Sequence, residues 1–136
     1  MVPMVDAPLD PADAAALRRV RAICLAFAGV EEAELQDRPL FRVGRRRFAL
    51  FNGAGSPPRA RWSSAGRSLH FLSDPLDIDA LGQDARFGPS PHHGHRGWMA
   101  LHLDEPVDWD EVAELCQDAY RAVAPRRLVA LLDEEP

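Results

Sequence analysis

Apolar residues recur at helical spacing near the start of the chain. Asp10 and Pro11 supply a cap residue and a first helical residue, the usual beginning of an α-helix. Gly29 is typical of a residue that ends a helix in a left-handed conformation. We therefore expect a helix from Pro11 to Gly29. The apolar positions that predict its buried face are Leu17, Val20, Cys24 and Phe27.

Alternating apolar and polar residues predict four strands in the middle of the chain. The first two flank a turn that begins at Gly44, a pattern typical of a β-hairpin. We expect an acidic link at 31–34. Residues 52–67 and 87–97 are rich in glycine, proline and other turn formers, so loops are expected there. The predicted strands are 40–43, 47–51, 68–72 and 98–103.

The C-terminal half has three further helix signals. Asp74 and the proline after it predict a short helix to about Asp84. Asp108 and Glu111 have the spacing of a capping box, and the apolar positions after them fit one helix face. A final helix is expected over 126–132.

The order of these elements predicts a single α+β domain. Residues 1–10 contain two prolines and no periodicity, so we expect a flexible N-terminal arm, with the domain over 11–133. The whole chain has 136 residues, which suits one domain. It has no apolar run of about 18 residues and no basic residue before an apolar block near its start, so we expect a cytoplasmic protein.

Charge is distributed unevenly along the chain. The net charge is −5, and all 16 basic residues are arginine. Residues 38–73 hold eight arginines and no acid, whereas the rest of the chain holds eight arginines and 21 acids. A basic middle with acidic flanks indicates a polar molecule with one face suited to an anion.

The basic middle segment is the strongest candidate for a functional surface. A guanidinium can bind two phosphate oxygens at once, and a hairpin with a flanking loop can contact a duplex backbone. Trp62, in the same segment, is a candidate for contact with a partner. The candidate DNA-binding residues are Arg42, Arg45, Arg46, Arg47, Arg59, Arg61 and Arg67.

Two structural explanations compete with DNA binding. The arginines can solvate an edge strand and deter association between sheets. They can also pair with the protein's own acidic helix, because residues 104–118 hold seven acids and no base.

Other chemistry has little support in the sequence. Cys24 and Cys116 are far apart along the chain and fit buried apolar positions better than a zinc site or a disulfide framework. His92, His93 and His95 share a loop without a cysteine or carboxylate ligand, so we expect no metal. The chain has no nucleophile elbow and no phosphate-binding glycine loop. We therefore expect no cofactor and no enzymatic activity.

Several short motifs in order resemble the MmcQ/YjbR-like family. None is specific alone, but their succession covers roughly residues 14–132. In this sequence the motifs are Ala28–Glu32, Phe41–Ala49, Gly94–Trp98, Leu103–Asp104, Trp109–Val112, Asp118–Tyr120 and Ala124–Pro125.

The resemblance implies a curved antiparallel sheet with helices packed on one face, similar to the frataxin-like and secretion-chaperone-like folds. Family members are described as DNA-binding by fold analogy and basic surface, and no catalytic residues accompany the family. The chain departs from the family pattern at two places. His92 and His93 stand where many members have an aromatic residue, and Arg45–Arg47 stand where members often carry lysine.

Three functional hypotheses follow. The first is a DNA-binding module that contacts the phosphate backbone. The second is a non-enzymatic protein-interaction adaptor that uses the sheet face or the Trp62 loop. The third is a small-ligand or metal site in the loop between Phe87 and Trp98.

Overall fold

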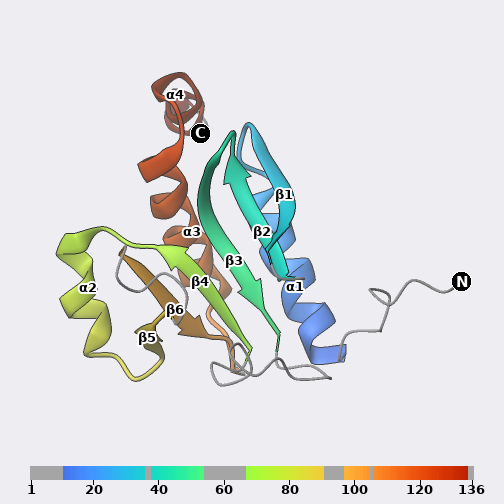
Figure 1. The fold of residues 1–136 in the computed structure, drawn as a ribbon, viewed down its shortest axis with the longest axis vertical. Coiled ribbons are helices and arrows are strands. Elements are labelled where there is room, and N and C mark those ends of the chain that lie inside the picture. Colours follow the sequence, from blue (N-terminus) through green and yellow to red (C-terminus); the bar gives the residue numbers. More distant parts are fainter. Residues whose placement is uncertain (1–10, 36–37, 54–66, 91–96, 105, 135–136) are drawn as a thin grey trace, which may run out of the picture.

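Six strands form one antiparallel sheet in the computed structural model (Figure 1). The structure describes residues 11–35, 38–53, 67–90, 97–104 and 106–134. The sheet order is β1-β2-β3-β4-β6-β5, so only the last two strands depart from chain order. The strands are β1 (Val30–Leu35), β2 (Arg38–Val43), β3 (Arg46–Asn52), β4 (Ser68–Leu72), β5 (Phe87–Pro89) and β6 (Trp98–His102), and the helices are α1 (Pro11–Cys24), α2 (Pro75–Gly82), α3 (Trp109–Val123) and α4 (Arg126–Glu134).

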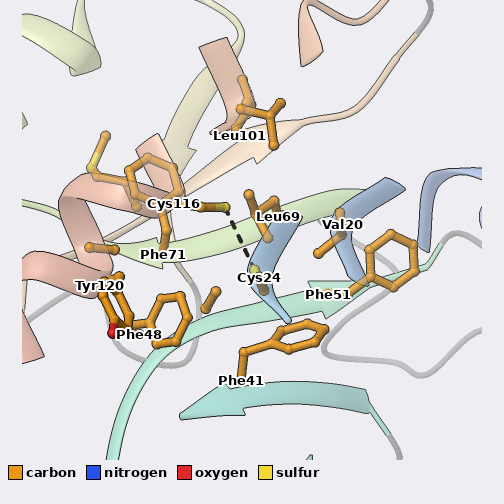
Figure 2. Packing of buried hydrophobic residues seen from close by; sticks show 14 of the residues in the cluster. Val20, Cys24, Phe41, Phe48, Phe51, Leu69, Phe71, Leu101, Cys116 and Tyr120 are labelled. Carbon is orange, nitrogen blue, oxygen red and sulfur yellow. Dashed lines mark hydrogen bonds between the residues drawn. The ribbon is translucent and has the colours of Figure 1, made fainter. Parts of the chain in front are cut away.

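The main hydrophobic core lies between the sheet and helices α1 and α3, which run behind the sheet in Figure 1. Tyr120 of α3 is fully buried there, and its ring stacks on Phe27 with ring centroids 4.8 Å apart. Its hydroxyl donates a hydrogen bond of 2.6 Å to the carbonyl oxygen of Ala28. Figure 2 shows this core, with side chains from both helices facing those of the central strands. These contacts confirm the α+β class and helices on one face of the sheet.

The opposite face of the sheet is also buried at its centre, but it is partly polar. Leu50 and His70 are directly opposite each other on β3 and β4, and both are fully buried. The two ring nitrogens of His70 lie 3.0 Å from the hydroxyl of Ser68 and 2.8 Å from that of Ser90. Because these groups are buried, the centre of this face is not an exposed apolar surface.

Most predicted elements are confirmed. The hairpin is formed by β2 and β3. The strands predicted at 68–72 and 98–103 are β4 and β6, which pair with each other, but all residues except the last of each strand are buried, so burial does not alternate along them. The carboxylate of Asp108 accepts hydrogen bonds from the backbone N–H groups of Asp110 and Glu111, as a helix cap does. The short helix after Asp74 ends at Gly82, two residues before the predicted end.

The first helix is shorter than predicted. It ends at Cys24, and a series of turns leads to Gly29, which is left-handed (φ 78°) but stands at the entrance to β1. The spacing of Phe27 suggested a continuing helix because its ring reaches the same core. In fact Phe27 reaches Tyr120 from a turn.

Two edge strands were not predicted. The expected acidic link at 31–34 is part of β1, which forms one edge of the sheet, with its glutamates exposed. Charged side chains protect an edge strand against pairing with other chains. Because the same charges interrupt the apolar pattern, the sequence did not predict this strand. At the other edge, β5 contains Gly88 and Pro89, which are typical of turns, although an edge strand tolerates proline.

No helix in the described part of the chain is long and apolar enough to cross a membrane. The predicted arm at 1–10 lies outside the described residues.

Candidate nucleic-acid interface

The turn between β2 and β3 presents three consecutive arginines. A two-residue turn, Gly44 and Arg45, joins the strands, and Gly44 has a φ of 58° that favours glycine. Arg45, Arg46 and Arg47 are all exposed. The predicted hairpin therefore places three guanidinium groups at one tip of the sheet.

Two arginines face each other across the hairpin. Arg42 of β2 is the cross-strand partner of Arg47 of β3, beside an irregularity in the strand register. Like charges in such positions repel each other. The nearest carboxylate oxygen of Glu31 is 3.9 Å from Nε of Arg42, and this buried nitrogen has no hydrogen-bond partner among the described residues. An anion bound at the tip would relieve the repulsion.

Arg46 connects the hairpin to the helical layer. Its Nη2 donates a hydrogen bond of 3.4 Å to the carbonyl oxygen of Ala122, in the last turn of α3. The chain then passes through Pro125 into α4, which Figure 1 shows at the same end of the molecule as the hairpin turn. Residues far apart in the sequence thus meet at this end.

Arg126 and Arg127 begin α4 and add to the basic surface. Both are exposed, and α4 packs on the core through Leu128, which lies beside Gly29. From the sequence, these two arginines are expected only to begin a helix. Two cations in the first turn of a helix are unfavourable to its dipole, and that anomaly was the signal available in the sequence. We call Arg42, Arg45, Arg46, Arg47, Arg126 and Arg127 the basic tip.

The two structural explanations for the hairpin arginines are not supported. Strand β2 lies between β1 and β3, and β3 lies between β2 and β4, so the hairpin is not at a sheet edge. Across the described ranges, none of Arg45, Arg46 and Arg47 forms an ion pair with a carboxylate. The acidic helix uses Glu111 to bind Arg86 instead, at 2.6 Å.

Arg67 does not belong to the basic tip. Its Nε donates a hydrogen bond of 2.5 Å to the carboxylate of Asp13 on α1, which is fully buried. The ion pair fastens the start of β4 to α1, and we leave Arg67 out of the proposed surface. Arg59, Arg61 and Trp62 lie outside the described residues.

A second charged region lies at the junction of β5, β6 and the start of α3. A pocket of about 210 Å³ there is lined by Arg86, His102 and several acids. The Arg86 guanidinium lowers the pKa of Asp84 to about 2, and it also binds Glu111. Because the one guanidinium is shared by two carboxylates, the region is acidic and unsuited to a phosphate backbone.

No cluster of metal-ligating side chains is present in the part of the chain that the structure covers. The His92–His95 loop lies outside it, so the prediction about metal there stays a prediction. The Ser68–His70–Ser90 group has hydrogen bonds like those of a catalytic relay, but all three residues are buried and offer a substrate no access.

The fold defines a class of small α+β domains with helices on one face of an antiparallel sheet. The family model YjbR matches residues 25–122, and the chain belongs to this family, which confirms the resemblance. The crystal structure of Deinococcus radiodurans protein DR2400, with the family-model domain DUF419, is similar in fold. Its TM-score is 0.65 at 20% sequence identity, over 86% of this chain and 87% of that chain. No curated protein matches the sequence.

Proposed function

We propose that this YjbR-family domain binds duplex DNA through its basic tip, by contacts to the phosphate backbone. The observation that carries the proposal is the group of three consecutive exposed arginines at the hairpin turn, which bind no carboxylate within the described residues. The domain is proposed to act without catalysis and in the cytoplasm.

The negative net charge of the molecule restricts where DNA can bind. Since the net charge is −5, DNA is repelled by most of the molecule and attracted only at the basic tip. The guanidinium groups come from β2, β3 and α4 and can contact successive phosphates. Because the guanidinium groups are proposed to contact phosphates and not base edges, we expect micromolar affinity with weak sequence preference.

The test compares two double variants that remove the same charge. Arg45→Ala/Arg47→Ala removes two arginines of the hairpin, and Arg18→Ala/Arg19→Ala removes two exposed arginines of α1. Affinity for two unrelated duplexes is measured by fluorescence anisotropy over a range of salt concentrations. We expect the hairpin variant to weaken binding several-fold on both duplexes. We also expect it to lower the log–log salt slope by about 2, one unit per lost phosphate contact.

The control separates local contacts from overall charge. The α1 variant should bind nearly as the unmodified protein does, because its arginines lie outside the basic tip. Binding that is insensitive to salt, or equally weak in both variants, would contradict the proposal.

The adaptor hypothesis has less support. The centre of the outer sheet face is buried, with Leu50 and His70 fully covered and Trp98 nearly so. Trp62, its other proposed contact, lies outside the described residues. Nuclease treatment before affinity capture distinguishes the two hypotheses, because only a protein partner would survive it.

A further inference from the structure

The two cysteines of the chain meet in the core. Cys24 is the last residue of α1, and Cys116 lies in the middle of α3, 92 residues later. Their sulfur atoms are 3.9 Å apart, and Figure 2 shows them facing each other between the two helices and the sheet. Both are free thiols. The sequence spacing suggested two unrelated apolar positions, whereas the fold makes them neighbours.

We propose that Cys24 and Cys116 form a redox-modification site, in which a hydroperoxide converts the two thiols into a reversible disulfide that joins α1 to α3. The bond requires a sulfur–sulfur distance of about 2.05 Å, so the sulfurs must approach by roughly 2 Å. Both side chains already point into the same space, and each lies on a helix that packs on the sheet through ordinary apolar contacts.

The chemistry balances in two steps. One cysteine, as thiolate, attacks the peroxide O–O bond and becomes a sulfenic acid, and the peroxide leaves as an alcohol or water. The second sulfur then attacks the sulfenic sulfur, the S–S bond forms, and the hydroxyl leaves as water. Two electrons pass from the sulfurs to the peroxide, and the two thiol protons end on the oxygen products.

The position of Cys24 suggests which thiol reacts first. Contact with Cys116 and burial raise the pKa of Cys24 well above its usual range, so the thiol is unreactive while the core is closed. Cys24 ends α1, however, and Leu25 beside it is partly exposed, whereas Cys116 is held within α3. Local opening of the last turn of α1 would expose Cys24 first.

The surroundings favour a disulfide over further oxidation. Apolar side chains such as Leu69 and Val20 lie near the sulfurs in Figure 2 and solvate a sulfenic acid poorly. The nearest nucleophile for that sulfenic acid is the other cysteine. When the last turn of α1 closes again, the sulfenic acid on Cys24 therefore meets the thiol of Cys116.

The test uses the full chain, reduced and then treated with hydrogen peroxide. We expect an intact mass lower by about 2 Da, because two hydrogens are lost. Both thiols should become unreactive to a maleimide under denaturing conditions, and a linked peptide pair should contain Cys24 and Cys116. Dithiothreitol should reverse all three changes. The oxidised chain should melt several degrees higher, because the cross-link closes a long loop in the unfolded state.

Single variants provide the controls. Cys116→Ala should gain oxygen at Cys24 or form a dimer between chains, with no rise in melting temperature, and Cys24→Ala should remain largely unmodified. The proposal is overturned if the unmodified protein only gains oxygen or links to a second chain. It is also overturned if the protein stays reduced in peroxide that oxidises an unfolded control. The mass and peptide measurements need no variant, so a variant that fails to fold does not weaken the test.

Discussion

Arginine side chains in this domain have three kinds of surroundings. The side chain of Arg67 is 18% exposed and binds the fully buried Asp13, so it stabilises the fold. Arg21 binds Glu32 through two hydrogen bonds of 2.8 Å at the surface, which contributes little to stability. Arg45 is exposed at the hairpin turn and is available to a ligand. The sequence shows eight arginines without an acid in one segment. The role of each arginine depends on whether a carboxylate from a distant part of the sequence lies beside it.

Replacement of Arg67 tests the first of these roles. Arg67→Ala leaves the buried carboxylate of Asp13 without this cation. We therefore expect the free energy of unfolding to fall by about 3 kcal/mol. Arg18→Ala, on the exposed side of α1, should change stability by less than about 0.5 kcal/mol. Urea unfolding measures both. Where the Arg67 variant is folded, its affinity for DNA should equal that of the unmodified protein. Lost DNA affinity with unchanged stability would return Arg67 to the binding surface.

At the level of elements, apolar periodicity predicts what is buried better than where an element ends. Helix α3 was predicted closely because its cap and its apolar face agree. Strands β1 and β5 were missed because each lies at an edge, where one neighbour suffices and charge or proline is tolerated. The end of α1 was misplaced because Phe27, which is half-buried, packs on the core from a turn. In each case the structure of the segment is determined by tertiary contacts, which cannot be read from the local sequence.

Gly29 is where α1, β1 and α4 come together, and its replacement tests that junction. Its φ of 78° is unfavourable for other residues, and a β-carbon there would lie 2.8 Å from the Cδ1 atom of Leu128. We expect Gly29→Ala to reduce the free energy of unfolding by about 1–2 kcal/mol. Gly82→Ala is the matched control, because no atom within 4 Å opposes its β-carbon and it ends helix α2. That variant should be neutral or slightly more stable. Equal stability of the two variants would contradict both the strain expected from the positive φ and the close contact with Leu128.

At the scale of the whole molecule, folding gathers charges that the sequence separates. The hairpin arginines lie within the basic middle segment, where the sequence indicated a binding surface. Arg126 and Arg127 lie about 80 residues further along the chain, within its acidic remainder. The contact of Arg46 with Ala122 and the packing of Leu128 beside Gly29 hold them at the same end. The distribution of charge along the sequence therefore predicted four of the six arginines of the basic tip.

The contribution of α4 can be measured separately from that of the hairpin. Arg126→Ala/Arg127→Ala should weaken duplex binding several-fold and lower the salt slope by about 2, because each arginine is expected to contact one phosphate. Stability should change little, since both side chains are exposed. Combined with Arg45→Ala/Arg47→Ala, the losses should add in free energy if the two pairs contact different phosphates. If the α4 variant binds as tightly as the Arg18→Ala/Arg19→Ala control while the hairpin variant is weakened, DNA is contacted by the hairpin alone, and α4 serves only to cover the end of the core.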